Sequence, residues 1–298
     1  MAAPGLPGGL GTLSGDSIGR RRRLVNGAVT VGMALALVAA LVPLCMVTWF
    51  LISKGAKVIS GEFLTGDIPR QYRKEGGGMG PAIVGTLVIT LTAAVLAIPL
   101  GVLGAVYLNE YGKQRRLARV IRTMADVMTG VPSIVMGLFI YVVWVIQTGE
   151  QSAFAGALAL ACLMLPIVIR TSEETLRLVP DELRQASLGL GAARWRTTLT
   201  VVLPAGLSGI TSGAMLAVAR AAGETAPLIA TVGLTFRANW RLNGQNTALA
   251  AQIFRNATQP FEGAQDRAWG AALTLVTIVF VLTLLARAVA SRFTVRTQ

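Results

Sequence analysis

The most constraining feature of the sequence is a series of long apolar runs that are separated by short, charge-rich segments. Residues 24–53 contain no Asp, Glu, Lys or Arg, and residues 76–109 are also free of them. A helix of about 20 apolar residues is long enough to cross the hydrocarbon core of a bilayer. Because lipid offers no hydrogen bonds, each crossing segment must pair its own backbone groups, as a helix does. The pattern predicts an all-α integral membrane protein.

The composition favours a membrane protein over a nucleic-acid-binding one. Only 14% of the residues are charged, whereas a soluble domain carries about a quarter. The formal net charge is +13, but most Lys and Arg flank the apolar runs, as the orientation of a membrane protein requires. Basic surfaces that follow a phosphate backbone usually lie on a soluble fold. We therefore expect no nucleic-acid partner.

The sequence offers few groups for catalysis or metal binding. It has no histidine, which excludes histidine-based catalysis and histidine ligands for a metal. Its two cysteines, Cys45 and Cys162, lie in apolar runs and are expected to be small buried hydrophobic residues. The adjacent Glu173 and Glu174 cannot share one helix face, so they make a poor acid–base pair. We expect neither a catalytic site nor a metal site.

Six apolar runs are long enough to cross the membrane. The first is too long for the hydrophobic part of a signal peptide and lacks a convincing cleavage site, so we expect it to be retained. Residues 1–23 end in four arginines and are predicted to form a disordered, basic cytoplasmic tail. Residues 24–298 are predicted to form one transmembrane domain. Its spans are expected at about 24–53, 81–108, 127–149, 152–169, 205–236 and 268–290.

The distribution of positive charge predicts the orientation of these spans. An even number of spans places both ends of the chain on the same side. With the N-terminus inside, the inner segments hold 17 of the 27 Lys and Arg residues, and the outer loops hold nine. Positively charged loops stay in the cytoplasm. We therefore expect a multi-pass protein of the cell (inner, cytoplasmic) membrane with both termini cytoplasmic.

The polar segment at about 171–204 is predicted to form a short helix, a turn and a second helix. Pro180 suits a first helical turn, and Asp181 and Glu182 are favourable at the positive end of the helix dipole. Gly191 can adopt the backbone angles of a sharp turn. Such a segment can present a compact helix to another protein.

This segment resembles the coupling loop of type I ABC-import permeases, whose pattern is Glu-Ala-Ala, three residues, Gly, nine residues, Ile, one residue and Leu-Pro. The matching residues are Gln185-Ala186-Ser187, Gly191, Val201 and Leu203-Pro204, with every spacing kept. Gln185 replaces the Glu and Ser187 replaces the second Ala. Gln keeps the hydrogen-bonding reach but loses the charge, so any charged contact with a partner is expected to shift to Glu182 or Arg184. An ordinary amphipathic interface loop is the alternative interpretation.

The resemblance implies a permease fold of six transmembrane helices with a cytoplasmic coupling helix that docks on a separate ATPase. The chain lacks the Gly-x-x-x-x-Gly-Lys-Ser/Thr phosphate loop, so ATP and Mg are expected on the partner ATPase subunit. We therefore expect a non-catalytic subunit that binds no cofactor itself. The residues expected to couple to the ATPase are Glu182, Arg184, Gln185, Ala186, Ser187, Gly191 and Pro204.

Further motifs resemble the A-type permease subunits of phosphate-specific ABC importers. They are Gly78-Met-Gly-Pro81, Tyr107-Leu-Asn-Glu110-Tyr111, Gly130-Val-Pro132-Ser133, Ala219-Arg220-Ala-Ala-Gly223-Glu224-Thr225-Ala-Pro227 and Ala264-Gln-Asp-Arg267-Ala-Trp269-Gly270. The resemblance covers most of residues 76–290. It implies inorganic phosphate as the substrate, a second non-identical permease, two ATPase subunits and an extracytoplasmic phosphate-binding protein as partners, with membrane lipid around the bundle.

The fifth run contains a charged pair that can be interpreted without the resemblance. An Arg inside a span costs about 2.5 kcal/mol or more and usually faces a partner or a water-filled path. Arg220 and Glu224 are four residues apart, so they can pair on one helix face. The donor fork of an Arg suits a phosphate oxyanion. We predict that Arg220 attracts phosphate, that Glu224 holds or releases it, and that Thr225 adds a hydroxyl donor. A permanent salt bridge between helices is the alternative.

Three more residues are candidates for the translocation path. Arg170 is placed near the inner mouth, although a cytoplasmic snorkelling anchor explains it as well. Pro132 and Ser133 are candidates to line the path, and a helix-entry turn explains them equally well. The outer loop at 54–74 either docks the binding protein or closes the bundle. The selecting, high-affinity phosphate site is expected on the separate binding protein.

The sequence therefore predicts a permease subunit that forms half of the path of an ATP-driven phosphate importer. A type I permease for another oxyanion or solute, such as sulfate or molybdate, remains an alternative. So does a membrane component of phosphate-supply signalling, a role that can coexist with transport. An ion channel or secondary transporter is a third alternative, against which the coupling loop argues.

Overall fold

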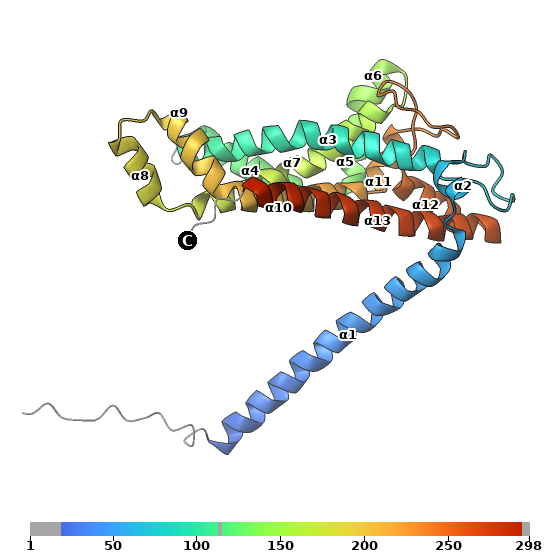
Figure 1. Ribbon diagram of the computed structural model, residues 1–298, viewed down its shortest axis with the longest axis horizontal. Helices are drawn as coiled ribbons and strands as arrows, with labels where there is room; N and C mark the ends of the chain where they lie inside the picture. Colours follow the sequence, from blue (N-terminus) through green and yellow to red (C-terminus); the bar gives the residue numbers. More distant parts are fainter. Residues whose placement is uncertain (1–18, 113–114, 294–298) are drawn as a thin grey trace, which may run out of the picture. The chain divides into compact units, whose positions relative to one another are not determined.

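The computed structural model describes residues 19–112 and 115–293, and every regular element in these ranges is a helix (Figure 1). The all-α fold class is confirmed. In chain order the elements are α1 (Arg20–Val58), α2 (Gly61–Thr65), α3 (Gly80–Val106), η2 (Tyr107–Tyr111), α4 (Arg116–Gly130), α5 (Ser133–Ile140), η3 (Tyr141–Val145), α6 (Ile146–Thr148), α7 (Ala153–Arg177), α8 (Asp181–Gly189), α9 (Arg194–Thr197), η4 (Thr198–Val202), α10 (Leu203–Ala222), α11 (Ala226–Thr231), α12 (Leu249–Ala257) and α13 (Glu262–Phe293).

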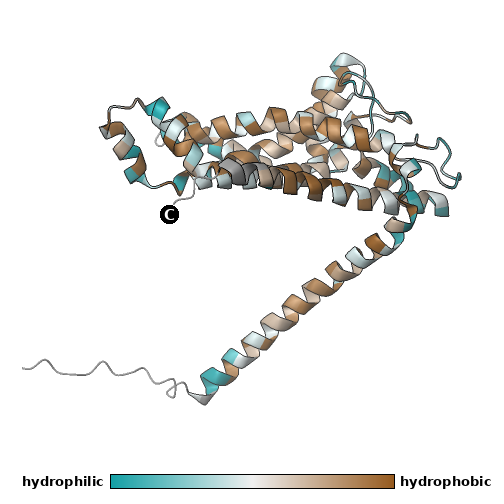
Figure 2. Cartoon of the chain, in the orientation of Figure 1, coloured by the Kyte–Doolittle hydropathy of each residue, from teal (hydrophilic) through white to brown (hydrophobic). Residues whose placement is uncertain are grey.

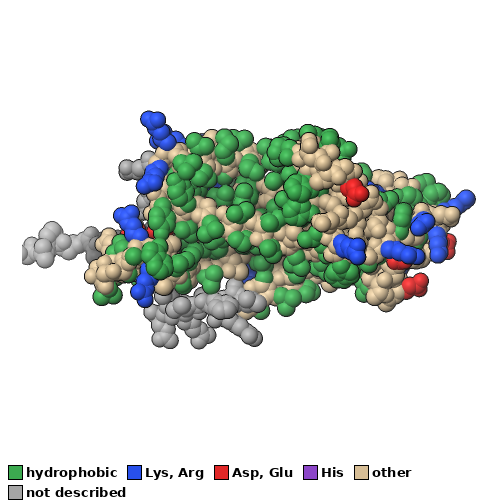
Figure 3. All heavy atoms as spheres, turned by 90° about the horizontal axis from the view of Figure 1, so that it is seen from above, with side chains coloured by type: hydrophobic (Ala, Val, Ile, Leu, Met, Phe, Trp, Pro, Cys, Tyr) green, Lys and Arg blue, Asp and Glu red, His purple; other side chains and the backbone are tan. Residues whose placement is uncertain are grey.

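Within residues 19–112 and 115–293, five helical stretches are long and apolar enough to cross a membrane. They are Arg21–Val58, Gly80–Tyr111, Ala153–Arg177, Arg194–Ala222 and Glu262–Ala288. A sixth crossing is obtained if α4 and the stretch Ser133–Thr148, which are bent by 108° relative to each other, count as one broken span. The apolar colouring of the long helices in Figure 2 and the apolar side chains that cover most of the face in Figure 3 fit a lipid environment.

The chain divides into two units, residues 1–50 and 51–298. The described part of the first unit belongs to α1, whose apolar side chains, such as Leu35 and Leu44, are exposed along its length. A helix that is apolar on every side suits a membrane. Of the tail expected at 1–23, residues 1–18 lie outside the described residues. The arginines at 20–23 were expected in that tail, but they form the first turn of α1 instead.

In the second unit, α7 is the central helix, with α3 packed along one side and α10 along another. Small residues let these helices approach closely: Gly101 of α3 lies against Val168 of α7, and Gly213 of α10 lies against Thr171. Ala93 and Ala97 of α3 are fully buried in the same apolar cluster. Figure 1 shows α8 and α9 at one end of this bundle, with α2, α6 and α12 at the other.

The segment expected as one span at 205–236 is not a single helix. The helical run begins at Arg194, earlier than expected, and ends at Ala222. A separate short helix, α11, begins at Ala226 with Pro227 in its first turn. Proline cannot donate a backbone hydrogen bond and its ring clashes with the carbonyl group four residues earlier, so it suits the first turn of a new helix rather than the interior of a continuous one.

The third expected span, 127–149, also differs from the observed helices. The chain is already helical from Arg116, and α4 ends at Gly130, just before Pro132. Leu117, Val120 and Met124 are exposed on one face of α4, and Ala118 is buried on another. The amphipathic α4 is thus separated from the apolar α5 by a sharp bend at the proline.

Replacing Gly85 of α3 by alanine is expected to destabilise the bundle. The added methyl group would overlap the carbonyl oxygen of Thr247 and the side-chain oxygen of Asn246, so the backbone would have to move. Overpacking of this kind costs about 1–3 kcal/mol. The thermal unfolding midpoint of the protein in detergent measures the effect. Gly130→Ala is the control, because nothing lies within 4 Å of a Cβ added there; equal midpoints for the two variants would contradict the expectation.

Candidate functional site

A cavity of about 180 Å³ lies between α4, α5, α7 and α10. Pro132 and Ser133 line it at the bend between α4 and α5, and Arg220 and Glu224 line it at the end of α10. The rest of its wall is largely apolar and includes Met164 and Pro166 of α7. Four of the six residues predicted for the path therefore meet at one site, although they come from two distant parts of the sequence.

Arg220 and Glu224 form a loose ion pair in this cavity. The Arg220 Nε and Glu224 Oε1 atoms are 3.6 Å apart, and the side chains are 67% and 20% exposed. Charged hydrogen bonds are normally about 2.7–2.9 Å long, so this contact is weaker than a direct bond. Among the described residues, no other acidic side chain pairs with Arg220. Most donors of this guanidinium are thus open to a ligand or to a partner.

The break after α10 sets the position of Glu224. Ala222 is the last residue of α10, and Glu224 follows in the break, with its backbone N–H bonded to the Ala221 carbonyl oxygen at 3.1 Å. The pair was expected on one continuous helix, but its acidic member lies just beyond the helix end. Glu224 is therefore placed by an irregular segment between two helices, which can change conformation more easily than a helix interior.

Thr225 does not line the cavity. Its hydroxyl lies 3.5 Å from the carbonyl oxygen of Ala250, which belongs to α12. The side chain is thus directed toward a different element from Arg220 and Glu224. The expected hydroxyl donor for the ligand is not at the cavity wall in this conformation.

Arg170 does not line the cavity either. It lies within α7, which continues to Arg177 rather than ending near 169. Its guanidinium forms a short ion pair with Asp126 of α4 and lies 3.6 Å from Glu173. Arg170 therefore ties α7 to α4 instead of marking the end of a span.

Glu173 is a structural centre that the sequence analysis missed. Its side chain is only 1% exposed, and its Oε1 accepts hydrogen bonds of 2.7 Å from Arg122 and from Arg177. Arg170 adds a third positive charge nearby. The spacing of Arg170, Glu173 and Arg177, at three and four residues, is the signal that indicates a shared helix face. The contribution of Arg122, which is 51 residues away, has no such local signal.

The coupling segment has the predicted helix–turn–helix form. Gly191 has a φ of +84°, a left-handed angle that a residue with a Cβ rarely adopts. Glu182, Gln185 and Ala186 are exposed on α8. Pro204 lies inside the continuous run Arg194–Ala222, in the first turn of α10. Ser187 bonds within the chain, to the hydroxyl of Thr197 at 2.9 Å.

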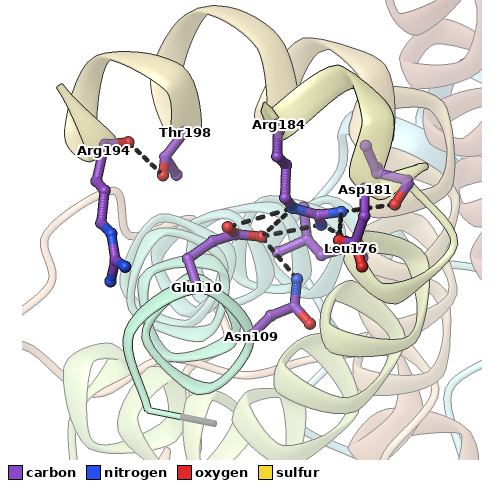
Figure 4. Close-up of polar contacts among 8 residues, drawn as sticks. Asn109, Glu110, Leu176, Asp181, Arg184, Arg194 and Thr198 are labelled. Carbon is purple, nitrogen blue, oxygen red and sulfur yellow. Dashed lines mark hydrogen bonds and ion pairs between the residues drawn. The ribbon is translucent and has the colours of Figure 1, made fainter. Parts of the chain in front are cut away.

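Unlike its exposed neighbours on α8, Arg184 is largely buried. Its side chain is 11% exposed and bonds to Glu110, to Asp181 and to two backbone carbonyl oxygens (Figure 4). The sequence analysis proposed Arg184 as a charged contact for the ATPase. The structure instead places its charge inside the chain, because Glu110, 74 residues away, lies next to it.

Arg267 holds the outer loop at the opposite end of the bundle from α8. It is buried in α13 and donates hydrogen bonds of 2.9 Å to the carbonyl oxygens of Tyr72 and Gly76, and one to that of Lys74. These bonds join the loop at 54–74 and the glycines that follow it to the bundle. Closing the bundle is thus a structural role of this loop.

Residues 97–295 match the family described as binding-protein-dependent transport system inner membrane component. The chain is 45% identical to phosphate transport system permease protein PstA 1 of Mycobacterium tuberculosis, over 89% of this chain and 88% of that one. It is 39% identical to PstA of Yersinia pestis, over 87% of this chain and 88% of that one.

The chain belongs to the PstA-type family of transport permeases. Solved structures agree on the fold. The MetNI methionine ABC transporter in its inward-facing conformation has a TM-score of 0.58 at 18% identity, over 73% of this chain and 94% of that one. A bacterial alginate ABC transporter in complex with an alginate-pentasaccharide-bound periplasmic protein also has a TM-score of 0.58, at 14% identity, over 92% and 96%. The ABC importer permease fold predicted for this PstA-type permease is confirmed.

Neutralising Glu173 of this PstA-type permease is expected to lower its stability. Glu173→Gln leaves Arg122, Arg170 and Arg177 near a neutral group, so they repel one another without a counter-charge. Because the arginines are partly exposed, we expect a loss of about 1–3 kcal/mol rather than the larger cost of a fully buried pair. Thermal unfolding in detergent measures it. The exposed neighbour Glu174 provides the control, and a Glu174→Gln variant as unstable as Glu173→Gln would argue against this role.

Proposed function

We propose that this PstA-type permease forms half of the translocation path of an ATP-driven inorganic phosphate importer. The observation that carries the proposal is the loosely paired Arg220 in a membrane-embedded cavity of a chain whose relatives are named phosphate transport system permease proteins. A planar guanidinium matches the oxygens of phosphate with two parallel hydrogen bonds. The chemistry of the cavity thus suits a small oxyanion.

Glu224 competes with phosphate for the guanidinium of Arg220. When phosphate enters, its negative charge can replace the distant carboxylate on Arg220 without removing a tight salt bridge first. When the bundle changes conformation, Glu224 can reclaim Arg220 and favour release of the anion. Binding remains weak in this scheme, as a path requires, and the selecting site belongs to the binding protein.

A second permease is proposed to cover the exposed side of Arg220. Two thirds of this side chain is exposed, although Arg220 lies in a span of apolar residues. A charge facing lipid at this depth costs about 2.5 kcal/mol or more, so the surface needs a polar partner or water. A second, non-identical permease facing Arg220 would enclose the path between the two subunits. Lipid would cover the apolar outer faces.

The ATPase subunits are proposed to dock on α8 through the exposed Glu182, Gln185 and Ala186. Nearby Leu190 is 90% exposed and Trp195 is also exposed, which is typical of a protein-binding surface. We propose that two such subunits carry the ATP and Mg, and that this chain itself is non-catalytic and binds no cofactor. The position of Gly191 keeps the two coupling helices in a fixed turn.

The location proposed is the cytoplasmic membrane, with both termini and α8 on the cytoplasmic side. Basic residues near α8, such as Arg115, Arg194 and Arg196, support this orientation because positive segments remain inside. The loop held by Arg267 would then face outward, where the phosphate-binding protein docks.

Uptake by the reconstituted complex tests the function. The chain is coexpressed with a second permease, the ATPase and the binding protein, and ATP-dependent phosphate uptake is measured with sulfate and molybdate as competitors. Arg220→Gln should lower uptake by at least about tenfold, the value of one charged hydrogen bond, in a complex that still assembles. Arg220→Lys should retain part of the activity, because it keeps the charge but not the fork.

Arg241→Gln is the matched control, since Arg241 is exposed in a loop away from the cavity. Selective uptake that survives Arg220→Gln would reduce Arg220 to a structural partner of Glu224. Uptake of sulfate or molybdate in place of phosphate would assign the permease to another oxyanion. An intact complex without ATP-dependent uptake would contradict the proposed function. The remaining interpretations would then be a signalling component or another class of membrane protein.

A further inference from the structure

The coupling helix α8 is held to the bundle by polar contacts rather than by apolar packing. None of its nine residues is fully buried. Leu183 and Leu188 are both exposed, although they are the large apolar residues of this helix. A hollow of about 560 Å³ beside α8 is lined by Leu188 and Arg184 together with Tyr111 and Thr198. Apart from the chain connections at its two ends, α8 is therefore joined to the spans mainly by a small number of hydrogen bonds and ion pairs.

Arg184 makes the most extensive of these contacts (Figure 4). Its Nε lies 3.2 and 3.3 Å from the two carboxylate oxygens of Glu110, and its Nη2 lies 3.0 Å from Glu110 Oε1. The guanidinium also donates to the carbonyl oxygens of Leu176 at 2.8 Å and Val179 at 2.6 Å, and to Asp181 at 2.9 Å. All three of its nitrogen atoms are thus engaged.

Glu110 lies at the end of the second span, in the π-helical segment η2 that continues α3. Its side chain is 13% exposed, and its Oε1 also accepts a 2.7 Å hydrogen bond from the amide of Asn109. Glu110 belongs to the Tyr107-Leu-Asn-Glu110-Tyr111 motif, for which the cavity provides no role. Its carboxylate joins α8 to α3 across 74 residues of sequence.

A second contact joins α8 to the fifth span. The hydroxyls of Ser187 and Thr197 are 2.9 Å apart, and Thr197 directly precedes the π-helical segment η4. η4 continues into α10, which carries Arg220. Glu110 thus lies within one π-helical segment and Thr197 directly before another, and such segments are irregular stretches that are frequent at functional sites.

We propose that the Arg184–Glu110 ion pair is the link that transmits movement of α8 to α3, with Glu110 as a positioning residue. The proposal rests on the function proposed above, in which α8 docks on the ATPase. A multiply bonded guanidinium–carboxylate pair resists both separation and rotation. Since α3 packs along α7, and α7 forms a wall of the cavity, movement of η2 can reach the residues around Arg220.

The bonds of Arg184 fall into two groups: those that hold the local shape of α8, and those that link α8 to α3. The bonds from Arg184 to Leu176, Val179 and Asp181 are local, because these residues lie within eight positions of it. They stabilise the turn between α7 and α8 whether or not Glu110 is charged. Glu110 is the partner that belongs to another span. Removing its charge should therefore loosen the link while the local fold of α8 remains.

The ratio of phosphate imported to ATP hydrolysed tests the link in the reconstituted complex. Glu110→Gln should lower this ratio at least about fivefold, the lower range of coupling free energies between sites, while the complex assembles and hydrolyses ATP. Glu110→Asp keeps the charge but shortens the side chain, so it should give an intermediate ratio. Asp181→Asn is the matched control: it removes a bond to the same guanidinium within α8 and should leave the ratio within about twofold.

Three results would overturn the proposal. The first is an unchanged ratio in Glu110→Gln, and the second is an equal loss in Asp181→Asn. The third is failure of both Glu110 variants to assemble, which would show that the pair holds the fold. Failure of the wild-type complex to import phosphate would count against the proposed function instead, and a distance measurement then decides the link independently.

That measurement uses electron spin labels on α8 and α3. Cysteines are introduced at the exposed Gly189 and Leu103 after Cys45 and Cys162 have been replaced by serine. In the wild-type background the distance between the labels should be the same without nucleotide and with ATP bound, because the helices move together. Glu110→Gln should shift or broaden the ATP-bound distribution. Identical distributions in both backgrounds would refute the link.

Discussion

The structure depends on the requirement that polar groups inside a bilayer find partners within the protein. Threonine hydroxyls in the spans meet it by bonding the carbonyl oxygen four residues earlier, as Thr171 and Thr274 do. Thr86 does the same and also accepts a 2.8 Å hydrogen bond from the backbone N–H of Leu249, which fixes the start of α12 against α3. These bonds leave the helices free to use small residues, rather than polar pairs, for most of their packing.

Close packing and tight ion pairs then divide the bundle into stiff and adaptable parts. The glycines that bring α3 and α10 onto α7 leave little room for independent movement of these helices. Around Glu173 the ion pairs with Arg122 and Arg177 are direct, and the one with Arg122 holds α4 to α7. By contrast, the residues at the cavity lie beside two breaks in the helices, one at Pro132 and one after Ala222. The polar path residues therefore lie beside interruptions of the helices rather than within helix interiors.

The sequence predicted the features that depend on local composition and spacing. Apolar runs located the spans, and the position of Gly191 indicated the turn between the coupling helices, because only local backbone chemistry is involved. The ends of the spans were less predictable. The run after Thr197 is apolar on both sides of the break at Gly223 apart from Arg220 and Glu224, so hydropathy alone does not separate α10 from α11. Pro227 is the local signal that was available there.

Long-range charge pairs were not predictable from the sequence, and one prediction was misdirected for this reason. Arg184 has an acidic neighbour at Asp181 and stands in a segment expected to meet a partner, so its charge was assigned outward. The partner that buries it, Glu110, is far away in sequence. Arg170 was assigned from its position near the end of a run, and Thr225 from its place beside Arg220 and Glu224. The contacts with Asp126 and Ala250 determine where these two side chains point.

Arg184 on α8 and Arg220 on α10 differ in how firmly they hold their carboxylate partners. Arg184 is largely buried and all three of its guanidinium nitrogen atoms are hydrogen bonded, so separating it from Glu110 would leave unpaired donors and acceptors and carry a large cost. Arg220 is largely exposed and holds its carboxylate at 3.6 Å, so changing its partner costs little. A displacement imposed at the α8 end is thus more readily absorbed at the cavity than at the α8 contact. This difference in strength favours rearrangement of Arg220 and Glu224 over loss of the connection to the coupling helix.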